Sequence, residues 1–206
     1  PIAEIQKFIT KKAREEGWTR IKAGKPVGRK AAVIGFGAAG IACAVTLVEA
    51  GVDVTVFEEA GYAGGTAEAV IPFGRLPKDV FRTEVDSLGL GDTGLFEVRY
   101  NTPLSAKMNL DDILDMGYDA VFIGAGMCKT AVLDLGSRPQ GVYDAMDFLY
   151  RNKTGGLELD DGMRAAVIGG GNTAMDAVSS LKERCLRNVY LIYRRSFKEL
   201  PAWKEE

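Results

Sequence analysis

The five-residue run AAVIG occurs twice in this chain, and each copy runs into further glycines. The first copy ends at Gly35 and the second at Gly169, 134 positions later. Each is followed by a segment with helical spacing and then by an apolar run typical of a strand, 52–57 and 189–193. Strand, glycine-rich turn, helix and strand form the βαβ unit of a parallel sheet. The repeat therefore predicts an α/β protein with two Rossmann-like parallel-sheet units, the second incomplete.

The first turn holds a complete Gly-x-Gly-x-x-Gly pattern, made by Gly35, Gly37 and Gly40. Such glycines allow a tight turn, close approach of a pyrophosphate to the backbone, and close packing of helix on strand. Glu58 ends the next strand, where a carboxylate can accept hydrogen bonds from both ribose hydroxyls and would repel a 2′-phosphate. An ordinary glycine-rich loop is the alternative, but this context favours a dinucleotide site.

The second turn, 169–174, has the Gly-x-Gly-x-x-Ala form of the same pattern. No carboxylate ends its following strand; Arg194 and Arg195 stand there instead. Two guanidinium groups suit a 2′-phosphate, to which they can donate charge-assisted hydrogen bonds. The pair predicts NADPH rather than NADH, the alternative being a solvated basic pair at a strand end.

Opposite charges at the two ribose positions indicate two different dinucleotides, most simply FAD at the first turn and NADPH at the second. Hydride passes directly from nicotinamide to flavin once the rings are stacked, so we expect no catalytic acid or base among the side chains. The absence of histidine from the chain agrees with this, and it also removes His-based triads and most zinc sites. No metal site is predicted.

Composition narrows the possible partners. The formal net charge of −2 gives no basic excess for nucleic acid, and no apolar run is long enough for a membrane span. Cys43, Cys128 and Cys185 form no Cys-x-x-Cys pair, which fits a reducing, cytoplasmic setting and argues against a thioredoxin-reductase-like enzyme.

The predicted organisation has three parts. Residues 1–28 form an amphipathic helix and linker from an upstream iron–sulfur domain, 29–150 an FAD-binding domain without its return segment, and 151–206 the start of an NADPH-binding domain. A first residue other than Met and an unfinished second sheet predict a piece of a longer protein.

The succession of motifs along the chain is more specific than either turn. GFGAAG, VTVFEEAGYAGG, IPFGRLP, YDAVFIGAG, GVYDAMDFL, VIGGGNTAMDA and YRRSFKELPA follow one another in that order. This order resembles the glutamate synthase small-subunit family, which includes the flavin and NADPH module of dihydropyrimidine dehydrogenase and a putative selenate reductase type. The resemblance covers essentially the whole chain.

The resemblance implies a role for individual residues. The FAD contacts it implies are Gly35, Gly37, Ala39, Gly40, Glu58, Gly64, Gly65, Thr66, Arg75, Leu104, Gly124 and Gly126. The NADPH contacts it implies are Gly169, Gly170, Gly171, Asn172, Thr173, Arg194 and Arg195. Arg75 would contact the flavin, with a surface arginine as the alternative, and Leu104 could equally be an ordinary core leucine.

The chain departs from the family pattern in a few places. Ala38 replaces a proline in the first turn, and the turn at Gly124 lacks a threonine. Cys128 follows that turn, and an ordinary loop cysteine is the simpler interpretation than a thiol beside flavin. The cysteine clusters that would bind 4Fe-4S clusters are absent, so such clusters are expected only in a domain outside this chain.

The function that the resemblance implies is electron input: NADPH reduces FAD, and electrons pass on to iron–sulfur clusters and to a larger catalytic subunit or fused domain. The final acceptor is left open. The alternative from another class is a non-catalytic nucleotide-binding or assembly module that uses its Rossmann-like units structurally.

Overall fold

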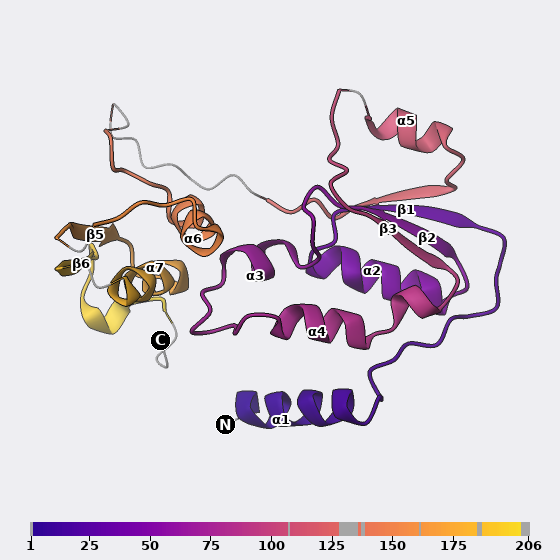
Figure 1. Ribbon diagram of the computed structural model, residues 1–206, viewed down its shortest axis with the longest axis horizontal. Coiled ribbons are helices and arrows are strands. Elements are labelled where there is room, and N and C mark those ends of the chain that lie inside the picture. Colours follow the sequence, from indigo (N-terminus) through magenta and orange to yellow (C-terminus); the bar gives the residue numbers. More distant parts are fainter. Residues whose placement is uncertain are drawn as a thin grey trace. The chain divides into compact units, whose positions relative to one another are not determined.

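A computed structural model describes residues 2–106, 108–127, 136, 139–160, 162–184 and 187–202 (Figure 1). The chain divides into two compact units. Unit 1 comprises Pro1–Glu68 and Lys78–Gly126, and unit 2 comprises Ala69–Pro77 and Met127–Glu206.

Unit 1 is built on a parallel sheet in the order β3-β2-β1-β4. The strands are β1 (Lys30–Ile34), β2 (Asp53–Phe57), β3 (Phe96–Arg99) and β4 (Ala120–Ile123). Pairs such as Ile34 with Phe57 and Ile34 with Ile123 bring the carboxyl ends of β1, β2 and β4 to one edge. Parallel α/β sheets bind ligands at the carboxyl ends of their strands, so this edge is a candidate binding site.

Helices pack on both faces of this sheet (Figure 1). Helix α2 (Ala38–Glu49) buries Ala44 and Val48 against Val33 and its neighbours, and α4 (Val80–Ser87) borders the same cluster. On the opposite face, α5 (Leu110–Asp115) inserts Ile113 against Ala32 and Ile34. Alternate residues of β1 thus serve two cores, as expected for a strand buried on both faces.

Three further segments lie outside the sheet. Helix α1 (Ile2–Glu15) is amphipathic as predicted, yet Ile5, Phe8 and Ile9 are exposed. A short helix that the sequence did not reveal, α3 (Gly65–Val70), follows the loop after β2. The 3₁₀ turn η1 (Leu90–Asp92) contributes the buried Leu90 to the α2 side of the sheet.

Unit 2 contains the second repeat. Strands β5 (Arg164–Ile168) and β6 (Asn188–Ile192) pair in parallel, and α7 (Asn172–Glu183) connects them. Helix α6 (Ala145–Thr154) packs against α7, and Phe148, Leu149 and Leu181 share a core with Val167 of β5. A 3₁₀ turn, η2 (Phe197–Glu199), follows β6.

The prediction of two parallel-sheet α/β units is confirmed. The two compact units do not have the same boundaries as the predicted domains, because α6 and residues 69–77 pack with unit 2. The limits 29–150 and 151–206 therefore stay a prediction. Within the described ranges, no helix is long and apolar enough to cross a membrane.

The α5 cap offers a stability test that does not touch the candidate site. The Asn109 side chain accepts hydrogen bonds from the backbone of Asp111 and Asp112, and Asp112 accepts one from the backbone of Asn109. We expect Asn109→Ala to cost about 1 kcal/mol of unfolding free energy, because such caps satisfy otherwise unpaired N–H groups. Denaturant unfolding measures this, with Asp115→Asn at the other end of α5 as the near-neutral control.

Candidate functional site

The carboxyl edge of the unit 1 sheet gathers three of the predicted residues. Gly35 follows β1, Glu58 follows β2 and Gly124 follows β4. The backbone N–H of Gly35 donates to Phe57 O at 2.8 Å, and that of Gly124 donates to Ile34 O at 2.8 Å. These bonds extend the ladders by one residue, so the turns leave the sheet at the same level.

The first glycine turn is as tight as its pattern predicts. Gly35 has φ +90°, and a Cβ on Gly35 would lie 2.6 Å from the carbonyl oxygen of Gly124. A Cβ on Gly40 would lie 1.9 Å from the carbonyl oxygen of Gly35. Both distances are far below van der Waals contact, so neither glycine can be replaced without moving backbone. The close packing of helix on strand expected of the third glycine is thus present.

A second pair of glycines lies against this turn. Gly65 starts α3 with φ +53°, and a Cβ on it would lie 3.1 Å from the Cα of Gly37. The N–H of Gly64 donates to Phe36 O at 2.8 Å. The structure thus brings Gly37, Gly64 and Gly65 together, with Thr66 next along α3, as the resemblance implies. Helix α2 begins after N-cap Gly37, so no side chain caps its first N–H groups. No acidic residue lies in the first turn of α2.

Glu58 is only 5% exposed and does more than the sequence predicts. Its carboxylate accepts one hydrogen bond from the N–H of Phe36 at 2.6 Å and another from the N–H of Ala60 at 2.8 Å. Glu58 therefore holds the first glycine turn directly. Because a carboxylate has about four acceptor positions, Glu58 retains capacity to accept a hydrogen bond from a ribose hydroxyl.

The charge of Glu58 also acts on a neighbouring tyrosine. Burial raises the pKa of Tyr100, and the negative charges of Asp86 and Glu58 raise that pKa further.

The remaining predicted flavin residues of unit 1 are less closely defined. Ala39 lies exposed in the first turn of α2. Gly126 has φ +76° with open space around it, and Leu104 is 38% exposed, so it is not a core leucine. Contact of these residues with flavin stays a prediction, and Cys128 lies outside the described residues.

The second glycine turn repeats the first in unit 2. The N–H of Gly169 donates to Ile192 O at 2.9 Å, and Gly169 has φ +146°. Gly171 is the N-cap of α7 and makes no side-chain cap bond. A Cβ on Gly171 would meet no atom within 4 Å, so there is open space beside Gly171 at the start of α7.

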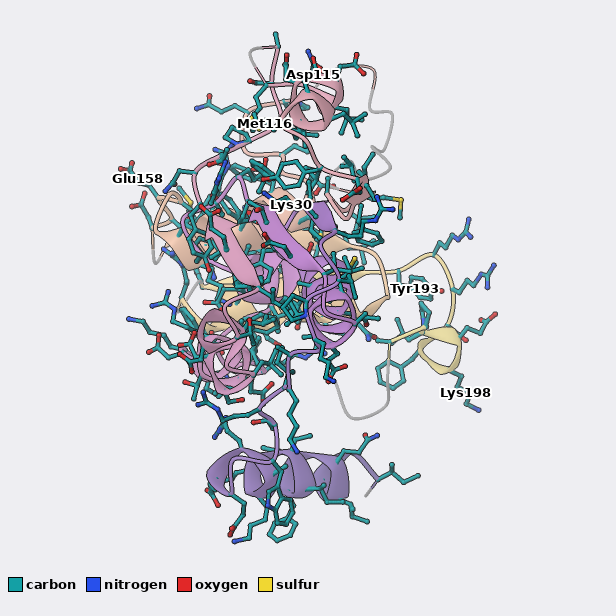
Figure 2. All side chains as sticks on the ribbon, turned by 90° about the vertical axis from the view of Figure 1, so that its right-hand side faces the viewer. Lys30, Asp115, Met116, Glu158, Tyr193 and Lys198 are labelled. Carbon is teal, nitrogen blue, oxygen red and sulfur yellow. The ribbon has the colours of Figure 1, made fainter. Side chains whose placement is uncertain are left out.

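The two turns differ at the position after the first glycine. Unit 1 has Phe36 there, with its ring buried in the core. Unit 2 has Gly170, and a Cβ on it would lie 2.6 Å from Leu200 and 2.7 Å from Tyr193. Leu200 and Tyr193 thus occupy the space that a side chain at Gly170 would need. Figure 2 labels Tyr193 and Lys198 on the segment that follows β6. No pattern in the sequence indicates this contact.

Arg194 and Arg195 follow β6 after a single residue, Tyr193, and both are exposed. Ile168 pairs with Ile192 in the register, which puts the arginines just beyond the level of Gly169. In the part of the chain that the structure describes, no carboxylate forms an ion pair with either one. Their charges are therefore available at the same sheet edge as the open start of α7.

Arg75 lies in unit 2 rather than among the turns of unit 1. Its Nη1 donates to both carboxylate oxygens of Asp176 on α7, at 3.0 and 2.9 Å. This pairing was not predicted. Contact of Arg75 with flavin stays a prediction, while the ion pair shows that Arg75 is not a free surface arginine.

Each unit thus presents bare backbone at a helix start, which is a favourable position for an anionic pyrophosphate. Beyond the second strand of its repeat, unit 1 has the buried carboxylate of Glu58, whereas unit 2 has the exposed arginines Arg194 and Arg195. Over the described ranges, no cluster of metal-ligating side chains occurs. The arrangement fits two dinucleotides of different ribose chemistry.

Comparison with known proteins gives the family. The model of the pyridine nucleotide-disulphide oxidoreductase family matches residues 29–202, which include both glycine turns. The chain belongs to this family.

Individual relatives agree with the predicted resemblance. The glutamate synthase [NADPH] small chain of Escherichia coli K12 is 36% identical over 219 residues, covering all of this chain and 45% of that protein. The putative oxidoreductase YgfK of the same organism is 33% identical over 205 residues, covering 96% of this chain and 19% of that protein. The chain thus spans less than half the length of these relatives.

Among solved structures, Mycobacterium tuberculosis FprA in complex with NADPH matches with a TM-score of 0.69 at 20% identity. The match covers 86% of this chain and 46% of that one. At this identity the likeness concerns the fold alone, and it agrees with the α/β architecture of both units.

Proposed function

We propose that the chain is the electron-input module of an NADPH-dependent flavoprotein oxidoreductase, with FAD at the turn of unit 1 and NADPH at the turn of unit 2. The observation that carries the proposal is the contrast between the two strand ends. Glu58 is buried after β2, whereas Arg194 and Arg195 are exposed after β6. A carboxylate accepts hydrogen bonds from ribose hydroxyls and repels a 2′-phosphate, whereas guanidinium groups bind a 2′-phosphate.

The residues divide the work of binding and orientation. In unit 1, backbone N–H groups at the start of α2 would hold the pyrophosphate of FAD, and Glu58 would hold its ribose. In unit 2, Gly171, Asn172 and Thr173 would hold the pyrophosphate of NADPH, and the arginines its 2′-phosphate. The bound cofactors supply the redox chemistry, since hydride can pass from nicotinamide to flavin without a side-chain acid or base.

The finer parts of the proposal rest on the family resemblance and on the partial coverage of the relatives. A glutamate synthase [NADPH] small chain is among the proteins this chain resembles, and the chain covers only part of each such relative. We propose that electrons leave the flavin for iron–sulfur clusters outside these 206 residues and then for a larger subunit or fused domain, in a cytoplasmic setting.

A visible spectrum tests the proposal. The protein is purified in the form its gene encodes, and we expect it to show the absorbance bands of oxidised flavin. Anaerobic NADPH should bleach these bands much faster than NADH. A protein that stays colourless after incubation with FAD would instead indicate a non-catalytic module, and equal bleaching by both nucleotides would contradict the assignment of the arginines.

A further inference from the structure

The Arg75–Asp176 ion pair is partly buried. Only 11% of the Asp176 side chain is exposed, and both of its oxygens accept from the same Arg75 nitrogen. A buried carboxylate without a partner costs much free energy, which is one reason for Asp176 to be paired. The position of Asp176 in its helix gives a second reason.

Asp176 is the fifth residue of α7, about one and a half helical turns beyond N-cap Gly171. An α-helix rises about 5.4 Å per turn, so its carboxylate lies close to the helix start. The free N–H groups there attract anions, and a nearby negative charge weakens that attraction. An uncompensated Asp176 would therefore work against a pyrophosphate bound at Gly171–Thr173.

We propose that Arg75 is a positioning residue that neutralises Asp176 and so keeps the start of α7 receptive to the pyrophosphate of NADPH. This inference rests on the proposed function of unit 2. It assigns Arg75 to the nicotinamide nucleotide, whereas the family resemblance implies a contact with flavin.

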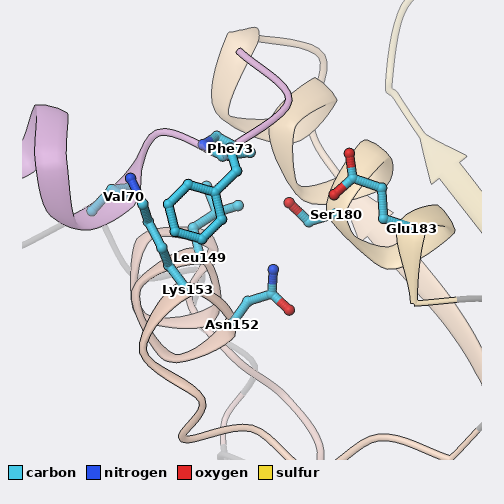
Figure 3. A pocket seen from close by; sticks show the side chains of 8 residues that line it. Val70, Phe73, Leu149, Asn152, Lys153, Ser180 and Glu183 are labelled. Carbon is cyan, nitrogen blue, oxygen red and sulfur yellow. The ribbon is translucent and has the colours of Figure 1, made fainter. Parts of the chain in front are cut away.

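The segment 69–77 is held by contacts that do not involve Arg75. Lys153 Nζ donates to Ile71 O at 2.8 Å and lies 4.7 Å from the ring centroid of Phe73. Val70 packs on the unit 2 core. Figure 3 shows Val70 and Phe73 at a small pocket that Leu149 of α6 and Ser180 of α7 also line. These contacts of the segment do not depend on the Arg75 side chain and remain when it is removed.

Binding of NADP⁺, measured by titration calorimetry on the flavin-loaded protein as its gene encodes it, tests the inference. We expect Arg75→Ala to raise the Kd about 10-fold, since an unscreened charge within one to two helical turns acts at that scale. Asp176→Asn should change the Kd by less than about 3-fold, and the double variant should return to near the wild-type value. The excess Kd of Arg75→Ala should also shrink at high salt.

The control and the contrary outcomes are separate. Arg151→Ala breaks an exposed pair with Asp147, also in unit 2, and should leave the Kd unchanged. A double variant as weak as Arg75→Ala overturns the inference. Loss of flavin from Arg75→Ala, with no loss of NADP⁺ affinity from the protein that retains flavin, also overturns it and makes Arg75 a flavin contact. Wild-type protein that does not bind NADP⁺ refutes the proposed function itself.

Discussion

Replacing Arg194 and Arg195 together by alanine will weaken NADPH binding by at least about 100-fold and leave NADH binding nearly unchanged. Each charge-assisted hydrogen bond to a phosphate is worth about 1.5–3 kcal/mol, and a tenfold change in affinity is about 1.4 kcal/mol. NADH has no 2′-phosphate, so it loses none of this. Measured Kd values for NADP⁺ and NAD⁺ give the two losses directly.

A matched control comes from the other end of the same strand. Arg187 is exposed just before β6, on the side away from Gly169. Arg187→Ala removes one positive charge from the same strand without touching the proposed clamp, so both affinities should persist. Equal losses for NADP⁺ and NAD⁺ in the double variant would rule out a 2′-phosphate contact and leave the arginines as a solvated basic pair.

Glu58→Arg will abolish flavin retention, while Glu59→Arg will not. Glu58 is buried and accepts from the N–H groups of Phe36 and Ala60, whereas Glu59 is exposed. A cation at position 58 loses these bonds, faces two donors and removes the ribose acceptor. Flavin content per protein, read from the visible and ultraviolet absorbance, measures the effect.

A milder change separates flavin binding from folding. Glu58→Gln keeps the size of the side chain but turns one acceptor into a donor, at a cost of about 1–3 kcal/mol. We expect a cooperative unfolding transition at somewhat lower denaturant and a flavin affinity reduced about 5- to 150-fold. Full flavin content in both Glu58 variants, each with a normal unfolding transition, would show that Glu58 has only a structural role.

The sequence predicts well where local pattern decides the structure. Gly35 and Gly40 fix the first turn because a Cβ on either would overlap backbone atoms, and the positive φ of Gly169 favours glycine at the start of the second turn. The β-branched and apolar runs give the strands for a similar reason, since both faces of the unit 1 sheet are covered.

The sequence fails where residues distant in the chain decide. The pairing of Arg75 with Asp176 joins positions 101 apart, and nothing near either residue announces it. Leu200 fills the space beside Gly170 because the chain bends back after β6, which no periodicity reveals. Glu58 was predictable as an acidic residue at a strand end, but its bond to the backbone of Phe36 depends on the shape of the turn.

The interleaved order of the two units has a consequence for synthesis. Residues 69–77 pack with unit 2, yet residues 78–126 of unit 1 follow them along the chain. A growing polypeptide can complete the sheet of unit 1 before α6 and α7 leave the ribosome, since domains fold largely in the order in which they are made. Until then Arg75 has no Asp176, and closure over 101 positions makes this pairing a late, slow event. Translation pauses placed between residues 126 and 145 should therefore change the yield of native unit 2 more than that of unit 1.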